Sequence, residues 1–297
     1  MGGKWLFVDE VHKYPLWARE LKTIYDGNPQ LRLVISASSA LDIYRGEADL
    51  SRRLITYNLP GMSFREYVAL KHKHTFDTLQ LGDLMANHDE IANRIVEGIK
   101  PLILFKEYME SGYYPYSLES GKTEYFIKIN QTITAIIEGD LAAVEGYSAA
   151  SIIKLKKLLG VIAESAPFQP NISAIAQKLG LSRDYVYLYL KHLENAKLLN
   201  FISAEGKGIS TLQKPDKIYL ENPNISYALR SSPDKGNLRE TFLLNQLLNA
   251  NIETTLPKSG DFMVDRQYTL EVGGKTKTGK QLKDATQAYI VADDIEV

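Results

Sequence analysis

Two adjacent carboxylates near the start of the chain have the residue types and the position to support chemistry. Asp9 and Glu10 directly follow residues 5–8 (WLFV), a short apolar run. Such a run predicts a strand that is buried on both faces, which suits the centre of a parallel sheet. Open α/β sheets bind their ligands at the carboxyl ends of these strands. The spacing therefore predicts a ligand site at both carboxylates, with a solvated strand end as the alternative.

A second apolar run indicates the element that would stand beside the first. Residues 31–35 (LRLVI) predict another buried strand, which Ser36 and Ser38 follow. A helix is predicted between the two strands, and it should end at the break in residues 27–29 (GNP). A strand–helix–strand unit of this kind implies a right-handed crossover and a parallel sheet.

Four short motifs follow one another along the first 67 residues. They are the apolar run that ends in Asp9 and Glu10, then ISASS at 35–39, LSRR at 50–53 and LPGMSFREY at 59–67. This order is similar to that in a family of bacterial and archaeal AAA-type P-loop ATPases, which usually carry a C-terminal domain of unassigned function. The chain departs from the family pattern at Ser51, where glycine is common, and at residues 61–62.

The resemblance implies roles for the residues at the predicted site. Asp9 would hold Mg²⁺, usually through water, and Glu10 would polarise the attacking water. Ser36 or Ser38 would be the small polar residue that reaches toward the γ-phosphate of ATP. Mg²⁺ and ATP are therefore the cofactor and substrate that the family implies.

The resemblance also implies two further features, one present and one missing. Arg52 or Arg53 would serve as a finger-like or sensor arginine, with plain surface charge as the alternative for each. The matching phosphate loop, GxxxxGK[ST], should lie before residue 5, and the chain begins too late to contain it. We therefore expect ATP binding and hydrolysis to be absent or crippled in this chain.

The composition is that of an ordinary soluble globular protein. Of 297 residues, 44% are hydrophobic and 24% are charged, and the net charge of −1 gives no overall basic field for nucleic acid. The absence of cysteine excludes disulfides and cysteine-based metal sites. The sequence shows no signal-peptide pattern and no run of 18 apolar residues. We therefore expect a cytoplasmic protein without a membrane partner.

The middle of the chain predicts helices that lead into a helix-turn-helix. Helices are expected at 83–98, 101–111, 122–140 and 148–165. Residues 171–202 then predict two capped helices joined at a turn in residues 180–182, and a strand after them. This pattern resembles a winged helix-turn-helix.

The second of these two helices has a mildly basic face that we expect to point outward. It carries Arg183, Tyr187 and Lys191, together with His192. These residues could contact the phosphates of DNA. Winged helices also serve as protein-docking modules, so the sequence leaves both alternatives open.

The C-terminal third predicts a helix, three strands, a helix and a strand. The expected ranges are 237–250, 252–256, 261–264, 268–272, 278–287 and 288–292. This order resembles the core of PD-(D/E)xK nucleases. The resemblance implies a nuclease-like site made by Glu240, Asp261 and Glu271, followed by Gln281 on the next helix.

The lysine of that core does not stand at its expected place. Gly273 occupies the position two residues after Glu271, and Lys275 comes two places too late. Lys277 or Lys280 would have to fold back to reach the carboxylates. We therefore expect a nuclease-like fold that does not cut DNA.

Together these patterns predict an α/β protein of four parts. The parts are a partial P-loop ATPase core at 1–70, a helical lid at 71–145, a winged helix-turn-helix at 146–207 and a restriction-endonuclease-like domain at 208–297. The function expected is that of an AAA-type ATPase, crippled here. The alternative is a DNA-binding module that acts through the last two parts. DNA, or a second copy that pairs with the open edge of the first sheet, is the partner expected.

Overall fold

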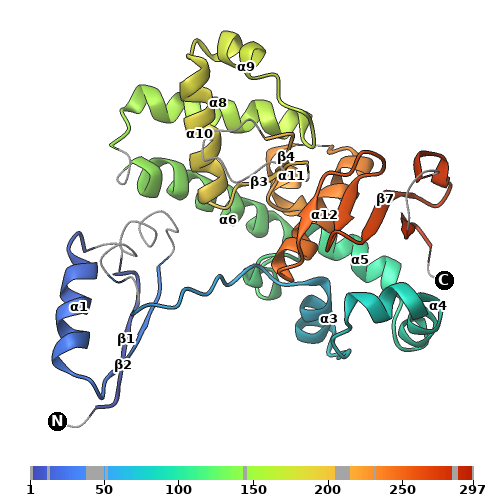
Figure 1. The fold of residues 1–297 in the computed structure, drawn as a ribbon, viewed down its shortest axis with the longest axis horizontal. Helices are drawn as coiled ribbons and strands as arrows, with labels where there is room; N and C mark the ends of the chain where they lie inside the picture. The colour runs from blue at the N-terminus through green and yellow to red at the C-terminus, as the bar shows by residue number, and fades with distance from the viewer. Residues whose placement is uncertain are drawn as a thin grey trace.

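In a computed structural model, shown in Figure 1, the protein is mixed α/β, and its described residues form three small sheets. The structure describes residues 3–11, 14–37, 50, 53–142, 146–204, 215–230, 232–282 and 287–295. None of the described helices is long and apolar enough to cross a membrane.

The first unit consists of two parallel strands and the helix that connects them, as the sequence predicts. β1 (Trp5–Val8) pairs with β2 (Arg32–Ile35), and α1 (Trp17–Gly27) lies between them in the chain. Their core contains Trp17 and Leu21 from α1, together with the partly buried Val8 of β1. The parallel pairing confirms the predicted crossover unit.

The expectation that both faces of β1 are buried was wrong. Side chains alternate between the two faces of a strand, so Leu6 and Val8 face one side while Trp5 and Phe7 face the other. Trp5 is 52% exposed and Phe7 is 70% exposed. The physical reason is that α1 covers the Val8 face, whereas the Trp5 face remains accessible to solvent. Self-association through this sheet stays a prediction.

An extended segment leads from the first unit into a series of helices (Figure 1). In order these are α3 (Phe64–His72), α4 (Leu81–Gly98), α5 (Pro101–Ser111), the 3₁₀ turn η2 (Pro115–Leu118) and α6 (Lys122–Ala135), which continues as the π-helical η3 (Ile136–Asp140). Ser63 begins α3 with a capping box, because its hydroxyl accepts from Glu66 N and the Glu66 carboxylate accepts from Ser63 N. Pro101 stands at the first turn of α5, where no N–H donor is needed.

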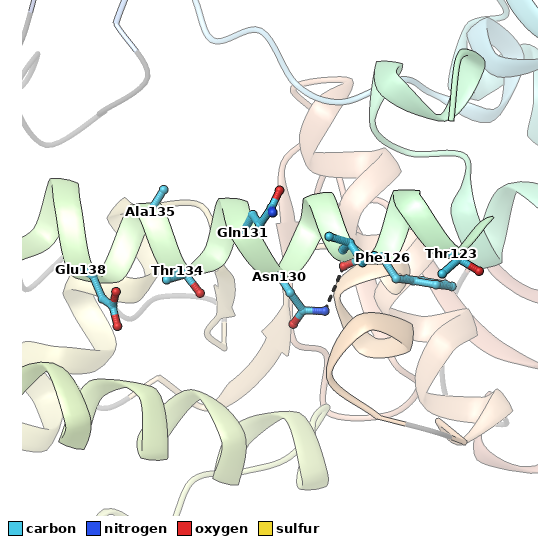
Figure 2. A pocket seen from close by; sticks show the side chains of 8 residues that line it. Thr123, Phe126, Asn130, Gln131, Thr134, Ala135 and Glu138 are labelled. Carbon is cyan, nitrogen blue, oxygen red and sulfur yellow. Dashed lines mark hydrogen bonds between the residues drawn. The ribbon is translucent and has the colours of Figure 1, made fainter. Parts of the chain in front are cut away.

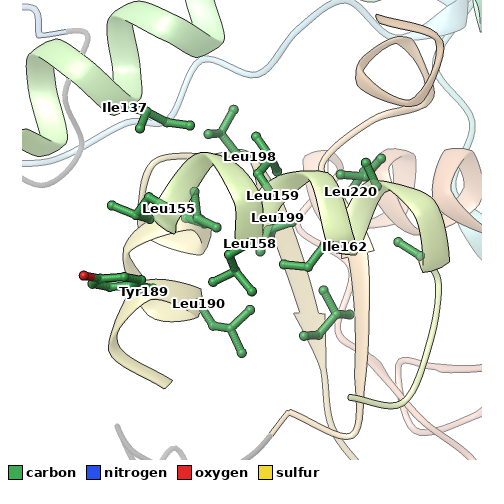
Figure 3. Packing of buried hydrophobic residues seen from close by; sticks show 14 of the residues in the cluster. Ile137, Leu155, Leu158, Leu159, Ile162, Tyr189, Leu190, Leu198, Leu199 and Leu220 are labelled. Carbon is green, nitrogen blue, oxygen red and sulfur yellow. The ribbon is translucent and has the colours of Figure 1, made fainter. Parts of the chain in front are cut away.

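Three capped helices and a two-stranded antiparallel sheet come next. The helices are α8 (Ala149–Ser165), α9 (Ile172–Leu179) and α10 (Arg183–Asn195), and the strands are β3 (Leu199–Ile202) and β4 (Lys217–Leu220). Asn171 and Ser182 cap α9 and α10 as expected. The apolar faces of these helices pack with α6 and both strands in one core cluster, part of which Figure 3 shows.

The C-terminal sheet has four strands in the order β5-β6-β7-β8. Its elements, with the helices before it, are α11 (Pro223–Leu229), α12 (Lys235–Asn249), β5 (Thr254–Thr255), β6 (Phe262–Val264), β7 (Tyr268–Gly274), η4 (Gly279–Leu282) and β8 (Ala288–Asp293). β5, β6 and β7 are antiparallel neighbours, while β7 and β8 are parallel. Of the helix expected at 278–287, the described residues form only the short η4.

The β3–β4 sheet lies between two cores and joins them. Leu199 and Ile218 belong to the large helical core, whereas Ile202 and Tyr219 belong to the core of the C-terminal sheet. Neighbouring strand residues face opposite sides, so one short sheet serves both cores. The domain boundary expected at 207/208 thus falls between two paired strands, and the four-part division stays a prediction.

A buried polar network ties the segment that precedes η2 to α11 and α12. The Tyr113 hydroxyl donates to Glu221 Oε1 at 2.7 Å, and Asn245 Nδ2 donates to the same oxygen at 2.9 Å. The backbone N–H of Tyr113 donates to Asn224 Oδ1 at 2.8 Å. Burial raises the pKa of Glu221, and the hydrogen bonds from the Tyr113 and Asn245 side chains oppose this rise. The network fixes the 112–115 segment (GYYP) against the last third of the chain.

Candidate functional site

The structure brings Asp9, Glu10 and Ser36 together at the carboxyl edge of the β1–β2 pair. The Ser36 hydroxyl donates a hydrogen bond to Asp9 Oδ1, and the backbone N–H of Glu10 lies 3.4 Å from Ser36 Oγ. Parallel pairing makes this possible, because Val8 and Ile35 are register partners and the next residues leave the sheet at the same edge. The predicted neighbourhood of the carboxylates and the serine is therefore present.

The backbone at Glu10 turns sharply away from the strand. Its φ is 52°, a left-handed conformation that costs an ordinary residue roughly 1 kcal/mol. Backbone hydrogen bonds hold this turn, since Ser36 N donates to Val8 O at 3.0 Å and Val11 N donates to Ser36 O at 3.1 Å. The two strand ends are thus locked to each other around Asp9 and Glu10.

Arg53, one of the two arginines expected at this site, pairs with a residue of α1 instead. Arg53 Nε and Nη2 donate to the two carboxylate oxygens of Asp26, at 2.9 and 3.2 Å. Asp26 is in the last turn of α1, and a helix that connects parallel strands runs antiparallel to them. The Arg53–Asp26 pair therefore lies toward the amino ends of the strands, opposite Asp9. Ser38 and Arg52 lie outside the described residues.

The oxygens at this edge suit a hard divalent cation only in part. Mg²⁺ prefers carboxylate and hydroxyl oxygens and is usually completed by waters and substrate phosphates. Asp9 is exposed and supplies one such carboxylate. Among the residues that the structure describes, no three His, Asp or Glu side chains form a group able to hold a metal ion unaided. A metal here would need the nucleotide itself as a ligand.

A second group of carboxylates converges on the C-terminal sheet, at the residues predicted for it. Glu240 comes from α12, Asp261 immediately precedes β6 and Glu271 is in the middle of β7. The Glu240 and Asp261 carboxylates are close enough for the charge of Asp261 to raise the pKa of Glu240, although burial is the larger cause. The Asp261 carboxylate accepts from the backbone N–H of Val272 at 2.8 Å, which ties it to β7.

Two lysines form ion pairs with carboxylates of this group, and the sequence-based expectation included neither as a site residue. Lys217 Nζ lies 2.6 Å from Glu240 Oε2, and Lys277 Nζ lies 2.5 Å from Glu271 Oε1. Tyr219 also donates to Glu240 Oε2, at 3.2 Å. We call the three carboxylates with Lys217 and Lys277 the carboxylate–lysine cluster. Gln281 belongs to η4, and its side chain lies outside the described part of the chain.

The sequence contained a partial signal for Lys277 but none for Lys217. β7 continues through Gly273 and Gly274, beyond the expected strand end at residue 272. The chain then turns back, with Lys277 N donating to Gly274 O at 2.8 Å. That turn returns Lys277 to the strand, whereas Lys217 reaches Glu240 from β4, which is distant in sequence.

The expected DNA-contacting face of α10 is only partly available. Lys191 pairs with Glu194 at 2.6 Å, one turn further along the same helix. His192 was expected to face outward, but it is buried and its Nδ1 shares a hydrogen bond with the Tyr147 hydroxyl. Arg183 is exposed and Tyr187 is partly buried. The correction at His192 follows from its contact with Tyr147, a residue outside the helix that a single-helix pattern does not reveal.

A large pocket elsewhere on the surface is lined by few titratable side chains. It has a volume of about 750 Å³ and runs along one face of α6, from Thr123 to Glu138. Figure 2 shows Phe126 and Asn130 on this face, with the Asn130 amide turned back to the Phe126 carbonyl. Glu138 is the titratable residue of its described lining, and Lys156 pairs with it at 2.5 Å. Its lining residues are distant in sequence from both carboxylate sites described above.

Comparison with known proteins agrees with the N-terminal geometry. Residues 1–68 match the model of an AAA domain, and residues 103–236 match a domain of unknown function (DUF8612). The chain is similar to the uncharacterized protein MJ1637 of Methanocaldococcus jannaschii, with 26% identity over 321 residues. The similarity covers 98% of this chain and 67% of the relative. No solved structure matches the chain.

Proposed function

We propose that residues 1–68 provide the metal- and water-handling part of an AAA-type nucleotide hydrolysis site. The observation that carries this proposal is the convergence of Asp9, Glu10 and Ser36 within the segment that matches an AAA domain. In this arrangement the Ser36 hydroxyl orients the Asp9 carboxylate, and the backbone N–H of Glu10 lies 3.4 Å from the oxygen of the same hydroxyl. Mg²⁺ bound with a nucleotide would neutralise phosphate charge there.

The affinity expected of this chain for ATP–Mg²⁺ is low. Tight phosphate binding relies on the backbone N–H groups and the lysine of a GxxxxGK[ST] loop, a sequence that the 297 residues do not contain. Carboxylates alone repel a triphosphate unless a cation bridges them. We therefore expect a dissociation constant on the order of 1 mM or weaker.

Calorimetry with ATP and Mg²⁺ tests the proposal on the whole chain. Asp9→Asn should weaken the Mg²⁺-dependent binding further, and Glu10→Gln should leave binding unchanged. Asp77→Asn, at an exposed position outside the site, is the matched control. Equal binding by wild type and Asp9→Asn would overturn the proposal. Micromolar affinity in the wild type would show that the phosphates are bound by groups other than those named here.

The finer architecture is also proposed. We infer that α8–α10 with β3 and β4 form a winged helix-turn-helix, because capped helices, a left-handed turn at Gly180 and a two-stranded sheet follow in that order. We infer a nuclease-like core from α12 and the β5–β8 sheet, where Glu240, Asp261 and Glu271 stand at the expected elements. DNA as a partner has weaker support, since Lys191 is already paired with Glu194.

A gel shift with duplex DNA at low salt tests the DNA alternative. If α10 contacts phosphates, Arg183→Ala should weaken binding, and the salt dependence of binding should become less steep by about one unit. Lys178→Ala on α9 provides a lysine control outside α10. Binding that is absent, or indifferent to Arg183, would remove this alternative.

A further inference from the structure

The carboxylate–lysine cluster contains one carboxylate that is fully buried. Glu271 has 0% of its surface exposed, in the middle of the four-stranded sheet. A buried carboxylate is stable only when a cation or several hydrogen-bond donors compensate the loss of water. The Lys277 ammonium, 2.5 Å from Glu271 Oε1, is a cation in direct contact with it.

Gly273 makes this contact possible. It is two residues beyond Glu271 on β7, so both positions face the same side of the sheet. A Cβ atom at Gly273 would lie 2.5 Å from Cβ and Cγ of Lys277 and 2.6 Å from its Cδ, distances that real atoms do not adopt. The stem of Lys277 therefore fills the space that a side chain at position 273 would need.

The same compensation is found at the other carboxylates of the cluster. Lys217 and Glu240 are both about four-fifths buried and lie 2.6 Å apart. Asp261 accepts from the backbone N–H of Val272. Among the described residues, no group of three carboxylate or histidine side chains is arranged to hold a metal ion. Two of the three carboxylates are thus paired with lysines of the same chain, and the third accepts a backbone hydrogen bond.

We propose that Lys277 is an internal cation that occupies the place of a divalent metal ion against Glu271, so that the cluster binds Mg²⁺ or Mn²⁺ only when this lysine is displaced. Carboxylates that converge without a cation repel one another, and oxygen ligands of this kind suit Mg²⁺ and Mn²⁺. With Lys277 in place, a divalent ion at Glu271 would meet a positive charge. The inference concerns the C-terminal sheet and does not depend on the proposed nucleotide site.

Mn²⁺ binding to the whole chain, measured without nucleotide by electron paramagnetic resonance, tests the proposal. Lys277→Met should create a site that binds at least about tenfold more tightly than any site in the wild type. Gly273→Ala should do the same although it keeps the lysine, because the new methyl group pushes the Lys277 stem away. Lys275→Met removes an exposed lysine from the same loop and should behave as wild type.

Two further variants assign the new site and keep the test decisive. Asp261→Asn added to Lys277→Met or to Gly273→Ala should abolish the gained binding, while Lys277→Arg should remain closed to Mn²⁺. If Lys277→Met does not fold, Gly273→Ala decides the outcome. Wild-type binding that equals that of the variants and depends on Asp261 would overturn the proposal. Folded variants without any gain in binding would overturn it as well.

Discussion

At the N-terminal sheet Asp9 is exposed and accepts a hydrogen bond from a serine hydroxyl, whereas at the C-terminal sheet Glu271 is buried against a lysine. Asp9 directly follows a strand of one parallel pair, and Glu271 lies within a strand of another. The first arrangement leaves oxygen atoms open to solvent, so an added cation and its ligand can be accommodated. The second is closed by its own cations. Carboxylates at a sheet are therefore not sufficient to identify a metal site. Whether a metal ion can bind depends on the positive charge that already lies beside them.

The two tryptophans of the chain allow the two regions to be followed separately. Trp5 and Trp17 both belong to the first unit, so tryptophan fluorescence reports the unfolding of that unit. Far-UV circular dichroism is dominated by the helices that follow it. Unfolding in urea, measured with both signals, can thus show which region a substitution destabilises.

The largest effect is expected from Lys277→Met. This change leaves the Glu271 carboxylate buried without its cation, and breaking a buried pair in this way costs about 3–5 kcal/mol. The urea midpoint from circular dichroism should fall, while the tryptophan midpoint stays where it is. An unchanged circular dichroism midpoint would mean that Lys277 does not compensate the charge of Glu271.

A smaller effect is expected from Gly273→Ala. The added methyl group overlaps the stem of Lys277 and forces it to move, and such overpacking costs about 1–3 kcal/mol. Gly121→Ala is a control, because a Cβ there meets nothing within 4 Å. Equal midpoints for the two variants would contradict the close packing of Lys277 over Gly273.

The contribution of Lys277 to the free energy of unfolding should also depend on pH, and in one direction. The hydrogen bond to Glu271 raises the pKa of Lys277 above its ordinary value of 10.5. Stability from this pair is therefore fully present below about pH 10 and is lost as the pH rises through the raised pKa. The difference in unfolding free energy between wild type and Lys277→Met should be constant at neutral pH and shrink in strongly alkaline buffer. A difference that already shrinks near neutral pH would contradict the pairing.

The smallest effect on stability is expected from Asp9→Asn. The Asp9 carboxylate is exposed, and the loss of its hydrogen bond with Ser36 should cost at most about 1 kcal/mol. Any change should show in tryptophan fluorescence alone. A loss of stability as large as that of Lys277→Met would show that Asp9 is as dependent on its partner as the buried Glu271 is.

Much of the fold could be predicted from local signals in the sequence. Asn171 and Ser182 cap helices where expected, and β2 (Arg32–Ile35) forms within the predicted run, parallel to the first strand. These features depend on neighbouring residues, so a sequence pattern contains them. Asp9, Glu10 and Ser36 could be grouped because a strand–helix–strand unit has only one common geometry.

The remaining features depend on contacts between distant residues. Lys217 of β4 contacts Glu240 of α12, and Lys277 contacts Glu271 through a turn that begins at Gly274. His192 is buried because Tyr147 packs against it from outside its helix. The exposure of Phe7 reflects which face α1 covers. An apolar run or a helical period does not specify any of these.

The measurement that tests the comparison most directly is the broadening of backbone amide resonances by Mn²⁺ with ATP, on the wild-type chain. Paramagnetic broadening detects weak binding and locates the metal. The account predicts broadening around Asp9, Glu10 and Ser36, lost in Asp9→Asn, with the amides next to Glu271 unaffected. Broadening at Glu271 in the wild type, or none at Asp9, would contradict it.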